Sequence, residues 1–141
     1  MDRTKEGFVK FNVDVTVIGA VGPKAIGGIL RDHTGVTLHR FSKYIGFSDP
    51  TSAELQGILE ACTCYASSPW TSSKPLVIES DSELAVNWIK QPFLVPVSFR
   101  ELVSKCKEYF VNFEWVIEFV FRERNVEAYR LARQGLESVQ E

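Results

Sequence analysis

The stretch that decides the fold is residues 9–17, Val9-Lys10-Phe11-Asn12-Val13-Asp14-Val15-Thr16-Val17. Apolar side chains occupy every odd position of this stretch, and polar side chains occupy every even position. Successive side chains of a β-strand point to opposite faces of a sheet, so a period of two predicts a strand with one apolar face and one polar face. Asp14 belongs to the polar face.

The residues that follow predict two more strands and then alternating helices and strands. Turn chemistry at Asp32-His33-Thr34-Gly35 joins a strand at 25–31 to a strand at 36–44. Capping and apolar spacing then predict helices at about 51–66, 80–90, 99–110 and 126–138 and strands at 76–78 and 113–121. The order β-β-β-α-β-α-α-β-α predicts an α/β fold in which helices pack on the faces of a mixed sheet.

Composition restricts the class of protein. The 141 residues are 45% hydrophobic and 24% charged, which predicts one globular domain over residues 1–141 with its core at about 8–138. The net charge of -2 excludes binding of nucleic acid through bulk positive charge, so a nucleic-acid site has to be a local patch or a metal site. No apolar run is long enough to span a membrane.

The cysteines indicate a reducing compartment. Only Cys62, Cys64 and Cys106 are present, an odd and low count that predicts no disulfide framework. Reduced thiols are typical of an intracellular protein, and the sequence leaves nucleus and cytoplasm open.

Three carboxylates lie where a predicted strand or helix begins or ends. Asp14 is on the first strand, Glu54 is in the first turn of the first helix, and Asp81 follows the strand at 76–78. Carboxylates in such places can converge and hold Mg²⁺, and two ions about 4 Å apart can catalyse phosphodiester hydrolysis. Each residue also has an alternative role. Asp14 could be solvated, Glu54 could complete a capping box with Thr51, and Asp81 could cap the second helix.

Four stretches resemble the RNase H-like domains of plant retroelements, the type associated with non-LTR reverse transcriptases. The opening hairpin is similar at residues 10–14 (KFNVD) and 27–35 (GGILRDHTG), and the first helix is similar at 52–57 (SAELQG). The third stretch is 77–82 (VIESDS), and the last motif is 122–135 (RERNVEAYRLARQG).

The resemblance implies a five-stranded mixed sheet and a nuclease site for RNA–DNA hybrids that uses two Mg²⁺ or Mn²⁺ ions. It makes Asp14, Glu54 and Asp81 metal ligands and catalytic residues. The chain departs from the family at the fourth carboxylate of the last motif, where it carries Tyr129. A neutral phenol is a poor ligand for Mg²⁺. The alternative role of Tyr129 is packing in a helical stripe with Val126, Ala132 and Leu136.

Substrate contacts are harder to predict from the sequence. The cationic side chains around the second and third helices are candidates for contact with phosphates, although the sequence favours ordinary solvated surface charges over this role. They are Lys90, Arg100, Lys105 and Lys107. Trp88 could stack on nucleic acid or pack in the core.

Two functions follow from these residues. The first is a metal-dependent endoribonuclease that cleaves, weakly, the RNA strand of hybrids. The second is a catalytically degenerate domain, a pseudoenzyme, that binds nucleic acid or a protein partner. The intact carboxylates favour the first function and Tyr129 favours the second.

Overall fold

The computed structural model describes residues 6–19 and 21–140. Its elements follow the predicted order, with boundaries that differ by a few residues. They are β1 (Val9–Val17), β2 (Lys24–Asp32), β3 (Thr37–Gly46), α1 (Pro50–Ala66), β4 (Leu76–Ser80), α2 (Glu83–Lys90), α3 (Arg100–Phe110), β5 (Trp115–Phe119) and α4 (Val126–Gln140). Short 3₁₀ turns lie at η1 (Pro92–Leu94), η2 (Val97–Phe99) and η3 (Arg122–Arg124).

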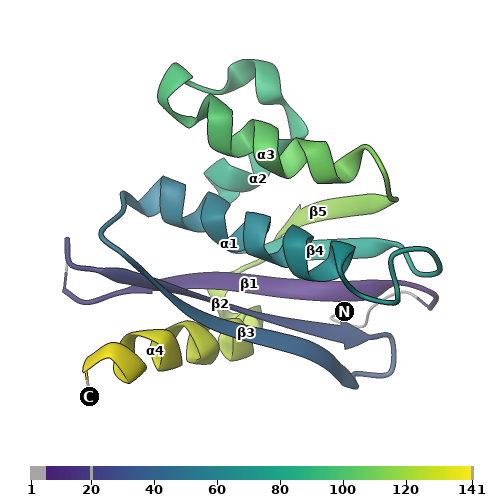
Figure 1. Ribbon diagram of the computed structural model, residues 1–141, viewed down its shortest axis with the longest axis horizontal. Helices are drawn as coiled ribbons and strands as arrows, with labels where there is room; N and C mark the ends of the chain where they lie inside the picture. The colour runs from purple at the N-terminus through teal and green to yellow at the C-terminus, as the bar shows by residue number, and fades with distance from the viewer. Residues whose placement is uncertain (1–5, 20, 141) are drawn as a thin grey trace.

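The five strands form one mixed sheet in the order β3-β2-β1-β4-β5. β1, β2 and β3 pair antiparallel, whereas β4 pairs parallel to β1 and β5 pairs parallel to β4. α1, α2 and α3 lie on one side of the sheet and α4 lies on the other (Figure 1). The predicted mixed sheet with helices on its faces is therefore confirmed.

The main core lies between the sheet and α1. The apolar face of β1 supplies Val9, Phe11 and Val13, all at most 1% exposed. They pack with the buried stripe of α1, which includes Leu55, Ile58, Cys62 and Tyr65. A period of two on the strand and of three to four on the helix brings these side chains to a common interface, as the sequence predicted.

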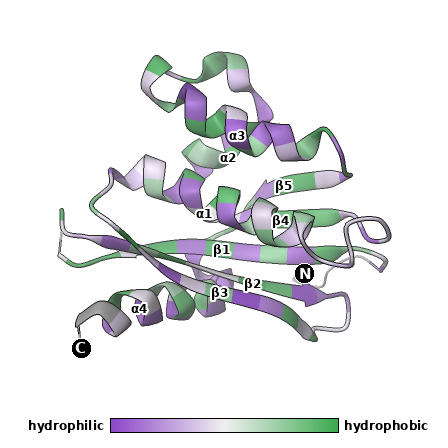
Figure 2. Cartoon of the chain, viewed as in Figure 1, coloured by the Kyte–Doolittle hydropathy of each residue, from purple (hydrophilic) through white to green (hydrophobic). Residues whose placement is uncertain are grey.

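The polar face of β1 is buried as well. Hydrophobic and hydrophilic residues alternate along β1 (Figure 2), yet Lys10, Asn12, Asp14 and Thr16 are all less than 9% exposed. The structure thus excludes a solvated Asp14, one alternative left open by the sequence. Buried polar groups need partners. Lys10 forms a 3.0 Å ion pair with Glu79, and the Asn12 amide donates to the same carboxylate at 2.8 Å.

The close packing of α4 on β2 depends on Gly27. An added Cβ at this residue would overlap the backbone nitrogen of Ala132 and the backbone oxygen of Ala128. We expect Gly27→Ala to lower the free energy of unfolding by about 3 kcal/mol because α4 must move away from the sheet. Urea denaturation measures this effect.

Gly57→Ala is the matched control. The nearest atom to an added Cβ at Gly57 is 3.7 Å away, which is ordinary contact. Gly57 lies inside α1, where alanine is the better helix former, so this change should stabilise the protein by about 0.5–1 kcal/mol. Equal destabilisation by the two substitutions would show that close packing of α4 does not require Gly27.

The capping of α1 differs from the prediction. Its N-cap is Asp49, whose carboxylate accepts a hydrogen bond from the Ser52 backbone nitrogen at 2.8 Å. The capping box between Thr51 and Glu54 is therefore wrong. The physical reason is that Pro50 has no N–H and suits the first position of a helix, so α1 begins before Thr51. The Glu54 carboxylate is consequently free for another role.

Two further predictions concern disulfide bonds and membrane-spanning segments. Cys62, Cys64 and Cys106 are free thiols. Among the residues that the structure describes, no helix has the length and apolar character needed to cross a membrane.

Candidate functional site

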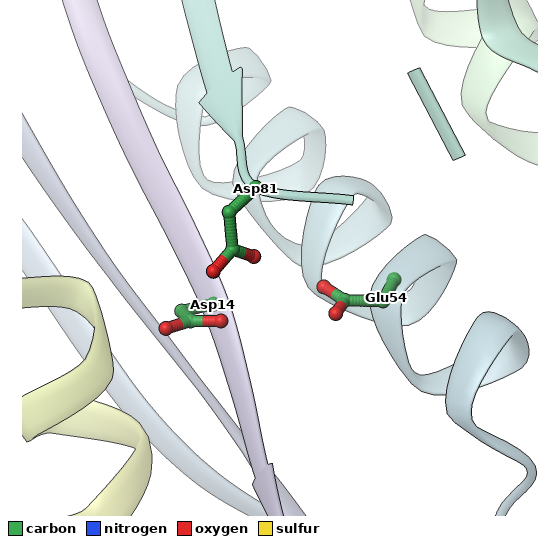
Figure 3. A group of neighbouring side chains, drawn as sticks. All are labelled: Asp14, Glu54 and Asp81. Carbon is green, nitrogen blue, oxygen red and sulfur yellow. The ribbon is translucent and has the colours of Figure 1, made fainter. Parts of the chain in front are cut away.

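Three carboxylates from three different elements meet at one point. Asp14 comes from β1, Glu54 from α1 and Asp81 from the residue after β4, and their side chains point toward one another (Figure 3). One oxygen from each carboxylate lies within 4.8 Å of the others. The structure thus brings together the three residues that the sequence singled out.

The register of the sheet explains this convergence. Val13 on β1 pairs with Ser80 on the parallel strand β4, so the next residues, Asp14 and Asp81, emerge at the same end of neighbouring strands. Glu54 lies near the start of α1 between Ala53 and Leu55, which are both fully buried. Burial of its neighbours holds the Glu54 backbone against the sheet. Asp81 does not cap α2, because that role belongs to Ser82.

The carboxylates repel each other in a poorly solvated place. Burial raises the pKa of Asp14 to about 7, and the negative charge of Asp81 adds to the rise. Burial also raises the pKa of Glu54 to about 8, with further contributions from Asp14 and Asp81. One oxygen of each carboxylate is buried without a hydrogen-bond partner. A buried anionic oxygen without a partner is unfavourable, so this cluster is suited to binding a cation.

Arg122 is a site residue that sequence reasoning missed. Its Nε lies 3.6 Å from Oδ2 of Asp81, although the side chain is 84% exposed. Its positive charge lowers the pKa values of Asp14 and Glu54 and so offsets part of the mutual repulsion. The sequence places Arg122 just after the last strand but carries no signal that this segment lies beside Asp81.

Asn125 is a second residue near the site that sequence reasoning did not identify. It is 1% exposed and precedes α4. Its amide donates to the Val13 backbone oxygen at 2.7 Å and accepts from the Asn12 amide at 3.1 Å. These bonds fasten the start of α4 to the strand that carries Asp14. An asparagine directly before a helix is a capping signal that could have indicated it.

Tyr129 lies near the start of α4. The side chain is 39% exposed, and its hydroxyl accepts a 3.4 Å hydrogen bond from Arg133. The packing stripe that joined Tyr129 to Val126 is wrong, because Val126 is 46% exposed. The other two residues of the predicted stripe, Ala132 and Leu136, are buried, together with Ala128 and Leu131. The helix is rotated this way because small residues are needed where it approaches Gly27.

The candidate nucleic-acid contacts lie on α2 and α3. Lys90 is exposed at the end of α2, and the Arg100 guanidinium donates to the Val95 backbone oxygen at 3.2 Å. Lys105 forms an exposed ion pair with Glu101, and Lys107 lies 5.0 Å from the centre of the Trp115 ring.

Trp88 is 9% exposed and packs on Phe99 with 4.9 Å between ring centroids. This burial favours the core role of Trp88 over stacking on nucleic acid.

Comparison with known proteins assigns the chain to a family. The family model described as reverse transcriptase-like matches residues 12–135. The chain belongs to this family. The match begins before Asp14 and ends after Tyr129, so all four positions discussed above lie inside the family's domain.

A curated relative narrows the type of domain. A putative ribonuclease H protein of Arabidopsis thaliana is 36% identical to the chain over 124 residues, which cover 84% of the chain. The same residues span only 19% of that protein. Together with the family match, this similarity identifies an RNase H-like domain of the plant retroelement type.

Solved structures confirm the RNase H-like fold. RNase H1 of Halobacterium salinarum superposes with a TM-score of 0.84 at 23% identity, covering 94% of this chain and 99% of that one. LC11-RNase H1, solved with an RNA/DNA hybrid, gives the same values. The foamy viral protease-reverse transcriptase with RNA/DNA hybrid has a TM-score of 0.76 at 16% identity and covers 92% of this chain and 20% of that one.

Proposed function

We propose that the domain binds nucleic acid and slowly hydrolyses the RNA strand of RNA–DNA hybrids with two Mg²⁺ or Mn²⁺ ions. The observation that carries this proposal is the convergence of Asp14, Glu54 and Asp81, each with a buried oxygen that lacks a hydrogen-bond partner.

The donor set fits a hard divalent cation. The cluster offers carboxylate oxygens alone, which Mg²⁺ and Mn²⁺ prefer, and no thiolate or imidazole, which would favour zinc. The pKa values of Asp14 and Glu54 are raised first by burial and then by the neighbouring negative charges, and a bound cation would offset both effects. Mg²⁺ sites in proteins commonly use one or two carboxylates and complete their coordination with water and substrate phosphate.

Each residue then has a distinct role. Asp14 and Asp81 would hold the ions, and Glu54 would hold one ion and orient a water molecule or a ribose hydroxyl. When bound, the two ions would activate the attacking water and stabilise the leaving oxygen of the phosphodiester. Arg122 is exposed beside Asp81, where its guanidinium can contact a phosphate of the bound strand.

Two solved structures with the same fold support an RNA–DNA hybrid as the substrate. LC11-RNase H1 and the foamy viral protease-reverse transcriptase were both solved with RNA/DNA hybrid. The basic residues of α2 and α3, Lys90, Arg100, Lys105 and Lys107, remain candidates for contact with hybrid phosphates.

The alternative function is binding without cleavage, to nucleic acid or to a protein. Tyr129 is the observation that favours it, because a neutral phenol stands where the family has a carboxylate and its hydroxyl bonds to Arg133. Three carboxylates still supply charge for a cation, so we infer weak cleavage and not its complete loss.

A hybrid-cleavage assay separates the two functions. We expect slow release of product from an RNA strand labelled at its end, in Mg²⁺ and in Mn²⁺, and none in a chelator. Asp81→Asn should reduce cleavage to background because it removes a charged ligand. Glu114→Gln is the matched control, since Glu114 is exposed just before β5, at the opposite end of that strand from Arg122, and it should cleave like the parent. Tight hybrid binding with no cleavage in either metal would favour the binding module.

A further inference from the structure

The strands β1, β4 and β5 are parallel, so their C-terminal ends lie together along one side of the sheet, which we call the carboxyl edge (Figure 1). β1 brings Asp14 to this edge and β4 brings Asp81. β5 ends there at Phe119, followed by Phe121 and Arg122. Ligands of open α/β sheets bind outside the carboxyl ends of the strands, so what β5 presents at this edge bears on the substrate.

Phe119, the last residue of β5, and Phe121, two residues later, carry two aromatic rings that we call the aromatic rim. Their side chains follow Trp115 and Ile117 on one face of the strand, and Ile117 is 1% exposed in the core. Phe119 is 37% exposed and Phe121 is 68% exposed. The helices that bury Ile117 therefore leave the aromatic rim partly open to solvent. The two ring centroids are 5.2 Å apart in an edge-to-face arrangement.

The aromatic rim is adjacent to the carboxylate cluster. Phe119 pairs in register with Ser80, the residue before Asp81. The Val120 backbone nitrogen donates to the Ser80 oxygen at 2.9 Å, and Arg122 reaches Asp81 at 3.6 Å. The backbone of the rim is therefore about one strand spacing, roughly 4.8 Å, from the strand that delivers Asp81.

We propose that the aromatic rim stacks an unpaired base of the nucleic-acid strand held at the carboxylate cluster. This inference rests on the proposed function and specifies its substrate as a hybrid with a single-stranded extension near the cleavage point. Bases inside a hybrid are stacked on each other and offer no free face, whereas splayed bases stack on aromatic side chains.

Several observations favour nucleic acid over a protein on the rim. The backbone of the rim lies one strand away from the strand that delivers Asp81. The exposed residues Arg122 and Arg124 follow within three residues of Phe121. Glu118 and Glu123 are also exposed in this stretch, so attraction of phosphates by net charge is weak here. Binding has to come from base stacking, for which two exposed phenylalanines are suited.

The experiment measures binding by fluorescence anisotropy with Ca²⁺ in place of Mg²⁺. The probes are a blunt RNA–DNA hybrid, the same hybrid with a single-stranded extension at either end, and the single strand alone. The variants are Phe121→Ser, Phe121→Leu and Phe121→Tyr. Phe121→Leu retains an apolar side chain without an aromatic face, and Phe121→Tyr retains the face. Phe93→Ser is the matched control, because Phe93 is 80% exposed on η1.

We expect an extended hybrid to bind the parent more tightly than the blunt hybrid. Phe121→Ser and Phe121→Leu should weaken that binding by about five- to 100-fold and leave blunt-hybrid binding unchanged. Phe121→Tyr and Phe93→Ser should behave like the parent. The two extended hybrids differ in which end carries the extension. The one that these two variants bind more weakly gives the direction of the bound strand.

Three results would overturn the inference. The first is equal affinity of the parent for blunt and extended hybrids, and the second is an equal loss of affinity for both hybrids in Phe121→Ser. The third is an effect of Phe121→Ser only on self-association, which light scattering measures. Phe121-dependent binding of the single strand, with no binding of any hybrid, would support the aromatic rim and overturn the proposed hybrid substrate. Absence of binding to every probe would overturn both.

Discussion

Tyr129→Asp should raise the rate of hybrid cleavage in Mg²⁺ by about 100-fold. Asn125 bonds to Val13 and its backbone oxygen accepts from the Tyr129 nitrogen at 3.1 Å, so this turn of α4 is fastened to the strand that carries Asp14. An aspartate there would supply the fourth anionic oxygen of the family's site. Misplacement of reacting groups by about 1 Å can reduce a rate roughly 100-fold, which is the scale of the expected gain.

The variant should remain folded. Because Tyr129 is exposed, the loss expected from a buried packing residue, about 2–4 kcal/mol, does not apply. The change in unfolding free energy with Mg²⁺ present should be within about 0.5 kcal/mol, as for other surface substitutions.

Initial rates on a labelled hybrid at saturating Mg²⁺ measure the gain. Tyr129→Asn is the matched control: it removes the same ring without adding a charged ligand, and it should stay near the parent rate. If Tyr129→Asp folds, binds Mg²⁺ and cleaves no faster, the missing aspartate is not the main defect, and the domain is a binding module.

Without metal, the protein should lose stability as the pH rises from about 4 to 8. The pKa of Asp14 is raised from 3.8 to about 7 and that of Glu54 from 4.5 to about 8. The folded state therefore holds more protons than the unfolded state within this range. Stability from these groups is fully present below the unfolded pKa values and is lost as the pH rises through the folded ones.

Glu54→Gln should remove much of this dependence. At pH 8 in a chelator, it should raise the free energy of unfolding by about 1–3 kcal/mol, because a neutral amide replaces a poorly solvated charge beside two others. The same change should abolish much of the stabilisation that Mg²⁺ gives the parent at pH 8. Urea denaturation at pH 5 and pH 8, with chelator and with Mg²⁺, measures both effects.

The control for this series is again Glu114→Gln, whose residue is exposed. It should follow the parent at both pH values. A parent protein whose stability in chelator rises between pH 5 and pH 8, or a Glu54→Gln variant that is less stable than the parent in chelator at pH 8, would contradict the burial of repelling charges at this site.

The sequence by itself determined the order of the elements through its patterns, and its resemblance to a family singled out the three carboxylates. The period of two in residues 9–17 predicted β1, and the short apolar stretch before Asp81 predicted β4. These signals are local, because a strand or helix imprints its period on adjacent residues. The resemblance to the family's last motif also predicted, without a structure, that Tyr129 stands at the position of the fourth carboxylate.

Tertiary structure decided which of these residues are buried and what they contact. Lys10, Asn12 and Asp14 have the alternation of a solvated face, yet α4 and the segment before it, more than 100 residues later in the chain, bury that face. Asp49 caps α1 and thereby releases Glu54, and the rotation of α4 onto Gly27 leaves Tyr129 exposed. Arg122 and the aromatic rim reach the site only because β5 pairs with β4. Such contacts join residues far apart in sequence, and no local period records them.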